Sequence, residues 1–163
     1  MSLRLTKKVL RKKAEPVTFE DPIENQRLAV EMSHFMLAEN GIGLSANQCG
    51  IAKRLFVMFT DRKWRHCFNP EIVNLSDRET EYPEGCLSFK GDTYNITRPS
   101  EVSVKYQDYM GNYKFEHLAG ISARCFLHEL DHLNGIVFEQ RFKQTVPGNY
   151  DYANIKSRSR KDH

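Results

Sequence analysis

The sequence lacks the segments that mark membrane-spanning and secreted proteins. None of its apolar runs approaches the ~18 residues that a transmembrane helix needs. The N-terminus carries basic side chains but neither an apolar h-region nor a cleavage signal, which argues against a secretory signal peptide. The cysteines are few and have no CxxC spacing: Cys49, Cys67, Cys86 and Cys125. We therefore expect reduced thiols and a cytoplasmic protein that contacts no membrane.

A strong net charge is also lacking. The 163 residues carry a formal charge of +3 at pH 7, which does not call for a sequence-specific nucleic-acid partner. The 40% apolar and 28% charged fractions are typical of a globular chain, and the length fits one domain. We expect a single domain over 1–163, with a core over 1–143 and a frayed basic tail over 144–163.

Basic residues gather at both ends of the chain. They are Arg4, Lys7, Lys8, Arg11, Lys12 and Lys13 at the start, and Lys156, Arg158, Arg160 and Lys161 at the end. Runs of this kind are usually solvated, and we adopt that interpretation. A weak electrostatic contact with an RNA-rich surface is the minority interpretation.

The first clear helix is expected over residues 22–39. Asp21 is a good N-cap, Pro22 suits the first helical position, and Glu24 completes a pair that resembles a capping box. An apolar stripe follows at helical spacing: Leu28, Met32, Phe35 and Met36. Asn40-Gly41 accepts the left-handed conformation that ends a helix. This helix is expected to be scaffold.

Apolar runs elsewhere predict strands and one further helix. The predicted strands are 54–60, 67–68 with 72–75, the two arms 102–106 and 113–115 of a hairpin, and a short return at 137–138. The second helix is expected over 119–134, where Asn134-Gly135 ends it. The predicted fold class is α+β, with antiparallel or mixed strands around this central helix.

The central helix contains the sequence HELDH at residues 128–132. Residues four apart share a helical face, so His128 and His132 can bind one metal ion with little rearrangement. Glu129 projects about 100° around the helix from His128, and it can reach a water on the metal without coordinating the metal itself. Two imidazoles and a free carboxylate are the arrangement of metal-assisted hydrolysis. The alternative is two surface histidines on a charged helix, because five residues can match by chance.

Families with this motif differ in their third metal ligand. One usual choice is a histidine at the position that Phe138 occupies here. Another is a glutamate about twenty residues downstream, where the region around Asp151 offers none. Cys86, beside the flexible Gly85, remains as an upstream candidate if it is a thiolate, although a lone cysteine is usually a small buried hydrophobe.

Residues 41–50 follow the first helix and read GIGLSANQCG. Gly41 and Gly43 allow another group to approach the backbone closely, or allow a positive φ. For Gly41, a helix end and tight turn are explanation enough. The pattern is not GxGxxG, so a dinucleotide-binding loop is not expected. Gln48 places an amide donor a few residues after the turn.

Three segments together carry a resemblance to a known family. GIGLSANQ at 41–48, EGCLS at 84–88 and HELDH at 128–132 resemble the signature motifs of peptide deformylases in order and spacing. The similarity extends over most of residues 4–142. It implies a metal-dependent hydrolase that removes the formyl group from the N-terminal formylmethionine of nascent polypeptides.

The resemblance also implies the metal centre and the reaction. Cys86, His128 and His132 would hold one divalent ion, with Fe(II) expected and Zn, Ni or Co as alternatives. The metal would lower the pKa of its water to give a hydroxide, with Glu129 as general base and then general acid. The Gln48 amide and the Leu87 backbone N–H would stabilise the oxyanion.

Further roles are expected around this centre. The segment of Ile42 and Gly43 would bind the substrate backbone in the manner of an added strand. Asp131 and the Arg98–Glu84 pair would support the ligands, with an ordinary structural ion pair as an equal alternative for each.

Two positions depart from the family's usual pattern. Ser45 stands where alanine is usual and adds a hydroxyl. Arg124, one turn before His128, stands where an apolar residue is more usual. We expect Arg124 to line the methionine-side pocket and to reach acidic or backbone groups of the substrate.

The chain resembles the short members of the family, including phage-encoded ones, which lack the long C-terminal helix implicated in ribosome docking. Contact with the ribosome surface is therefore expected to be weak, and a monomer is expected. The alternative function is a catalytically silent metal-binding adaptor with the same fold. Glu129 and Gln48 disfavour it, as does a site with fewer than four protein ligands. The motifs leave open the native metal, the source organism and the peptide preference beyond formylmethionine.

Overall fold

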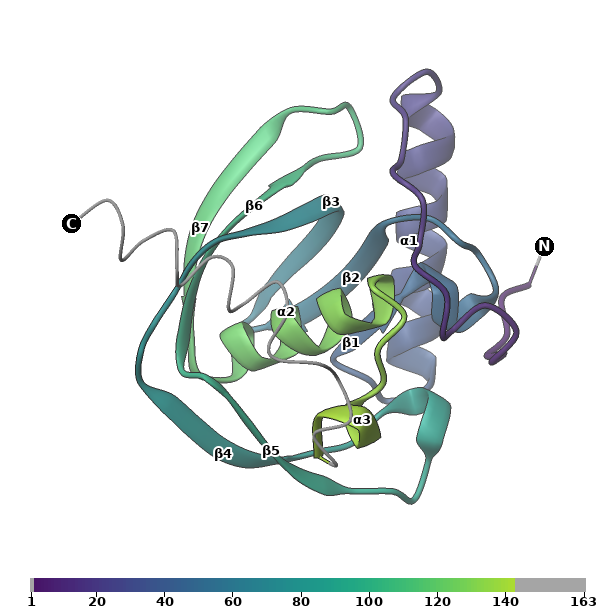
Figure 1. Ribbon diagram of the computed structural model, residues 1–163. Helices are drawn as coiled ribbons and strands as arrows, with labels where there is room; N and C mark the ends of the chain where they lie inside the picture. Colours follow the sequence, from purple (N-terminus) through teal and green to yellow (C-terminus); the bar gives the residue numbers. More distant parts are fainter. Residues whose placement is uncertain (1, 143–163) are drawn as a thin grey trace.

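The computed structural model describes residues 2–142 (Figure 1). Within this range, five strands form an antiparallel sheet in the spatial order β1-β2-β3-β6-β7. These strands span Gly43–Ser45, Leu55–Thr60, Lys63–Leu75, Glu101–Gln107 and Tyr113–Ala119. A separate antiparallel pair consists of β4 (Glu79–Glu84) and β5 (Tyr94–Pro99). The α-helices are α1 (Pro22–Ala38), α2 (Gly120–Leu133) and α3 (Phe138–Phe142).

Helix α2 lies at the centre of the fold, and strands of both sheets contact it (Figure 1). The predicted α+β class with strands around a central helix is therefore confirmed. Every residue of α2 from Ser122 to Leu133 is buried. Because burying a polar group costs free energy unless it is bonded, the polar side chains of α2 need partners inside the protein. This requirement shapes the site.

Strand β2 is buried on both of its faces. Phe56 and Met58 belong to the apolar cluster that includes α2, whereas Leu55 and Val57 belong to the cluster that includes α1. Phe56 meets Phe126 of α2 edge to face, with ring centroids 4.9 Å apart. The continuous apolar run of this strand follows from its position between two clusters.

Helix α1 begins and ends as its sequence predicts. The Asp21 side chain accepts a hydrogen bond from the Glu24 N–H at 3.1 Å, although the Glu24 side chain itself pairs with Arg27 rather than closing a capping box. At the other end, Asn40 adopts the left-handed conformation with φ 60°. The Gly41 N–H then bonds the Met36 carbonyl at 2.9 Å, as in a Schellman motif.

The C-terminal end of α2 is tied to segments from much earlier in the chain. The Leu133 carbonyl accepts hydrogen bonds from the Ala14 N–H at 2.8 Å and from the Arg54 guanidinium at 3.0 Å. The His132 carbonyl accepts one from the Asn47 side-chain amide. The last carbonyls of a helix have no partner within it, so these bonds satisfy groups that α2 leaves open.

Several elements within residues 2–142 differ from the sequence-based expectation. The predicted strand at 137–138 is wrong, because Phe138 begins helix α3. Strands β4 and β5 were not predicted, and Pro83 within β4 is a residue that argues against a strand. The two predicted fragments 67–68 and 72–75 form the single strand β3, in which register shifts near Glu71 and Asn74 break the alternation.

No helix within residues 2–142 is long and apolar enough to cross a membrane. Residues 2–21 contain a turn near residues 8–12 and otherwise form neither helix nor strand, apart from a bridge between Glu15 and Lys53. The frayed tail predicted for 144–163 lies outside the described residues.

Glu116 of β7 generates a prediction about stability in acid. Burial opposes its ionisation, but hydrogen bonds from Arg65, Tyr106 and Lys63 outweigh burial and hold its pKa at about 2. The folded state therefore gains stability from the ionised carboxylate above its ordinary pKa of 4.5, and loses this gain as pH falls through about 2. We expect Glu116→Gln to remove this part of the pH dependence of the free energy of unfolding, measured by urea denaturation. The exposed Glu20→Gln is the control. If the free energy of unfolding depended on pH equally in the two variants, the prediction would be contradicted.

Candidate active site

Helix α2 and the chain after β4 bring three potential metal ligands together. His128 and His132 lie one turn apart on α2, with their Nε2 atoms 3.1 Å apart. Cys86 follows the end of β4, and its Sγ lies 3.4 Å from His132 Nε2. The three ligand atoms lie within 4.8 Å of one another. The structure thus gathers the cysteine and both histidines that the sequence singled out.

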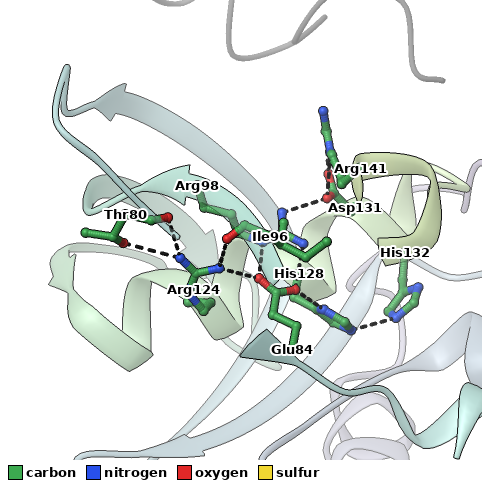
Figure 2. A network of polar contacts seen from close by, with 9 residues as sticks. All are labelled: Thr80, Glu84, Ile96, Arg98, Arg124, His128, Asp131, His132 and Arg141. Atoms are coloured by element: carbon green, nitrogen blue, oxygen red, sulfur yellow. Dashed lines mark hydrogen bonds and ion pairs between the residues drawn. The ribbon is translucent and has the colours of Figure 1, made fainter. Parts of the chain in front are cut away.

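The hydrogen bonding of His128 suits metal binding. Its Nδ1 lies 2.8 Å from Glu84 Oε1, in the buried cluster that Figure 2 shows. A carboxylate oxygen accepts hydrogen bonds, so Nδ1 carries a hydrogen, and the ring turns Nε2 toward His132. A thiolate and two imidazole nitrogens fit a divalent first-row metal ion.

Glu84 joins the site to two buried guanidinium groups (Figure 2). Arg98 donates to both of its carboxylate oxygens at 2.7 and 3.0 Å, and Arg124 donates to Oε2 at 2.6 Å. Burial opposes ionisation of Glu84, but the charge of Arg98 and the hydrogen bonds of His128 and Arg98 outweigh burial and hold its pKa well below the ordinary value. The ionised carboxylate therefore fixes the ring of His128 in place.

Asp131 extends the same network on the other side of Arg98. It accepts hydrogen bonds from Arg98 at 2.8 Å and from Arg141 of α3 at 2.7 and 3.0 Å. The sequence singled out Asp131 and the Arg98–Glu84 pair, and the structure joins them in one cluster. Arg141 gave no signal in the sequence, because nothing there indicated that α3 would turn back toward α2.

Glu129 points into the site and is buried. Within residues 2–142, its Oε2 has no hydrogen-bond partner. Burial raises the pKa of this carboxyl to about 7, a value suited to a group that takes up and releases a proton near neutral pH. A carboxylate so placed has room to bond a water or a substrate.

Gly43 explains how Glu129 fits against β1. A Cβ on Gly43 would lie 2.7 Å from Glu129 Oε1 and 2.8 Å from Cys125 Sγ, which is too close for real atoms. Neither Gly43 nor Gly41 has a positive φ. A positive φ therefore does not explain the glycine at position 43. Gly43 allows another group to approach the backbone closely, and that group is the carboxylate of Glu129.

Gln48 faces the candidate metal ligands from the 3-10 helix η1 (Ala46–Cys49). Its Nε2 lies 3.0 Å from Ser88 Oγ and 3.6 Å from Cys86 Sγ. Leu87 directly follows Cys86 and opens a second 3-10 helix, η2 (Leu87–Phe89). The contact with Ser88 was not anticipated, although Ser88 belongs to the same EGCLS segment as Cys86.

A cavity of about 340 Å³ opens beside these residues. Its lining includes Ile42, Gly43, Gln48, Leu87, Arg124 and Glu129. All the residues with predicted catalytic or substrate-binding roles thus border one space next to the three metal-ligand candidates.

Arg124 lines this cavity, but its guanidinium bonds to the protein (Figure 2). Besides Glu84, the guanidinium donates to the Ile96 carbonyl at 2.8 Å and to the Thr80 carbonyl at 2.8 Å. The predicted contact of this group with a substrate would have to compete with these bonds. The aliphatic part of the Arg124 side chain can form a wall of the cavity while the guanidinium keeps its hydrogen bonds.

A family model described as polypeptide deformylase matches residues 3–147 of the sequence. The chain belongs to the peptide deformylase family. The peptide deformylase of Thermotoga maritima is 45% identical over 135 residues, which are 82% of this chain and 80% of that protein. The crystal structure from the same organism superposes with a TM-score of 0.82 at 38% identity, covering 87% of this chain and 98% of that one.

Two further solved structures show the same fold. A probable peptide deformylase from Synechococcus phage S-SSM7 superposes with a TM-score of 0.81 at 37% identity, covering 86% of this chain and 100% of that one. A class I type b peptide deformylase from Acinetobacter baumannii, bound to Met-Ala-Ser, has a TM-score of 0.81 at 32% identity, over 86% and 99% of the two chains. This peptide deformylase is accordingly a metal-dependent hydrolase that removes the formyl group from N-terminal formylmethionine.

Glu84 provides a test of how the metal site is held. Glu84→Gln keeps the size of the side chain but removes the charge that orients His128 and neutralises the two guanidinium groups. We expect about 10- to 100-fold weaker metal binding, measured by competition with a chromophoric chelator. The matched control is Glu81→Gln, an exposed position on the same strand. Unchanged affinity in a folded Glu84→Gln variant would contradict the prediction.

Proposed function

We propose that Cys86, His128 and His132 bind an Fe(II) ion, with Zn, Ni or Co as substitutes. The proposal is supported by the convergence of one sulfur and two nitrogen atoms within 4.8 Å. Thiolate and imidazole ligands suit several first-row metals, so the choice of iron rests on the family resemblance. A divalent ion in this position supplies Lewis-acid chemistry, polarising a carbonyl group and lowering the pKa of water.

We propose that Glu129 moves the proton in this hydrolysis. Its carboxylate takes the proton from the attacking water and returns it to the departing amine of methionine. Its burial, its pKa of about 7 and the open hydrogen-bonding position of Oε2 support this role. The close packing of Glu129 on Gly43 limits where the carboxylate can go, which keeps the proton acceptor in place.

The formyl oxygen gains negative charge as the water attacks. We propose that the Gln48 side-chain amide and the Leu87 backbone N–H donate hydrogen bonds to this oxygen. The position of Gln48 Nε2 beside Cys86 supports the first donor, because an oxygen bound next to the metal would lie within its reach.

We propose that Ile42, Gly43 and Arg124 bind the substrate beside the catalytic groups. Ile42 is half exposed at the mouth of the cavity, where its neighbouring backbone can pair with an extended peptide. Arg124 would contribute the wall of the methionine pocket through its side-chain stem, while its guanidinium stays on Glu84 and Thr80. This assignment modifies the initial expectation that the guanidinium itself reaches the substrate.

The proposed substrate is the formylated N-terminus of a nascent chain in the cytoplasm. The Acinetobacter baumannii structure with bound Met-Ala-Ser supports a short methionyl peptide as the recognised unit. We propose that the protein acts as a monomer and contacts the ribosome only weakly, through the basic N-terminal residues. A silent metal-binding adaptor is disfavoured, because such a role would need neither the Glu129 carboxylate nor the Gln48 amide.

The first experiment measures formate release from formyl-Met-Ala-Ser by protein purified anaerobically with Fe(II). We expect Glu129→Gln to lower kcat by about 10²–10⁴-fold, because the amide cannot accept the proton, while the metal content stays unchanged. Metal content and melting temperature are the controls. A metallated wild type that releases no formate would favour the adaptor, and an active Glu129→Gln variant would remove Glu129 from the mechanism.

Arg124→Leu tests the methionine pocket. Leucine keeps an apolar wall but loses the bonds to Glu84 and Thr80, so we expect KM to rise several-fold and the preference for methionine over norleucine or leucine to change. Kinetics with formyl-peptides that differ only in the first side chain measure both. If Arg124→Leu left peptide preference and kcat/KM untouched, Arg124 would have no part in substrate binding.

A further inference from the structure

The hydroxyl of Ser45 is turned toward Gln48 inside the protein. Ser45 ends β1 immediately before η1, and it is completely buried, as is Gln48. The backbone N–H and the Oγ of Ser45 both lie 3.0 Å from Gln48 Oε1. An amide oxygen only accepts hydrogen bonds, so the hydroxyl of Ser45 must be the donor.

These two bonds determine the orientation of the Gln48 amide. A carbonyl oxygen has two lone pairs, and here each can be used by one donor from Ser45. The amide oxygen therefore faces Ser45, and Nε2 faces Ser88 Oγ and Cys86 Sγ on the opposite side. An amide turned by 180° would place its NH₂ group against the Ser45 N–H, which can only donate, and buried donors avoid facing each other. In the observed orientation both groups of Ser45 donate to Oε1.

The Ser45 hydroxyl gives Gln48 Oε1 a second hydrogen-bond donor beside the Ser45 backbone N–H. With alanine at position 45, the backbone N–H would remain as the single donor to Oε1, and one lone pair would be left buried without a partner. A second donor on Oε1 also polarises the amide, which strengthens its N–H groups as donors. Both effects act on the side of Gln48 that faces the metal ligands.

We infer that the Ser45 hydroxyl is a positioning residue that orients and polarises the Gln48 amide for its contact with the formyl oxygen. The inference rests on the proposed role of Gln48 as a donor in the reaction. It gives a purpose to a residue at which this chain departs from the family's usual alanine.

A double-mutant cycle tests the inference, using formate release by the Fe(II) enzyme. We expect Ser45→Ala to lower kcat by about fivefold with little change in KM, the effect of one buried hydrogen bond. In the Gln48→Ala background, Ser45→Ala should change kcat no further. Ser33→Ala is the matched control, because Ser33 is also buried and its hydroxyl bonds the Ala29 carbonyl away from the site.

A spectroscopic measurement separates the inference from the proposed role of Gln48. In the zinc-loaded protein, the side-chain NH₂ resonances of Gln48 are assigned by their loss in Gln48→Ala. We expect Ser45→Ala to shift and broaden these resonances, and Ser33→Ala to leave them unchanged.

The outcomes are distinct. Equal losses of kcat from Ser45→Ala in both backgrounds would overturn the inference, because Ser45 would then act other than through Gln48. Unchanged kcat and unchanged Gln48 resonances in Ser45→Ala, with kcat lowered in Gln48→Ala, would also overturn it and leave the role of Gln48 standing. If Gln48→Ala kept full kcat, the donor role of Gln48 would fall, and with it any catalytic effect of Ser45.

Discussion

The buried carboxylate of Glu84 is the interaction on which the site depends. Removing a charge from water costs several kcal/mol, so the carboxylate persists there because Arg98 and Arg124 neutralise it. Its fourth hydrogen bond goes to His128 Nδ1. Since Cys86 follows Glu84 by two residues, the same contact docks the end of β4 against α2 and brings the candidate sulfur ligand beside the two candidate nitrogen ligands. One carboxylate thereby sets the relative position of ligands from two elements.

The central helix combines the roles of scaffold and site. Alternate sides of α2 present apolar residues such as Phe126 to the sheet and ionisable residues to the network around Arg98. A helix buried on every face cannot leave its charges in solvent, so each one is paired or faces the cavity. Glu129 faces the cavity, and its Oε2 has no hydrogen-bond partner within residues 2–142, as a group proposed to accept a proton requires.

The features that could be predicted from the sequence are those that depend on residues close together along the chain. Short-range signals located helix α1, the central helix with His128 and His132, and the β6–β7 hairpin. Cys86 was an open candidate from the residues alone, and the resemblance of EGCLS to a family motif indicated its place beside the two histidines. Strand β4 could not, since its stability comes from pairing with β5 and from the ion pairs of Glu84 rather than from its own residues. For the same reason no local pattern indicated the hydrogen bond of Arg141 with Asp131, or that of Gln48 with Ser88. The expectation that the guanidinium of Arg124 faces the substrate failed for a related reason. The guanidinium bonds to Ile96 and Thr80, which lie in strands β5 and β4, and neither strand was predicted.

The hydrogen bonds at the C-terminal end of α2 have a consequence for the order of folding. The carbonyls of His132 and Leu133 are satisfied by Asn47, Arg54 and Ala14, which the ribosome synthesises long before the helix. These are contacts of high sequence separation, and such contacts form late and slowly because a long loop must close first. The two histidines therefore reach their final places only when nearly the whole described chain is available. An enzyme whose substrates are unfinished proteins would itself be inactive until its own synthesis had passed the helix that carries the two histidines proposed to bind its metal.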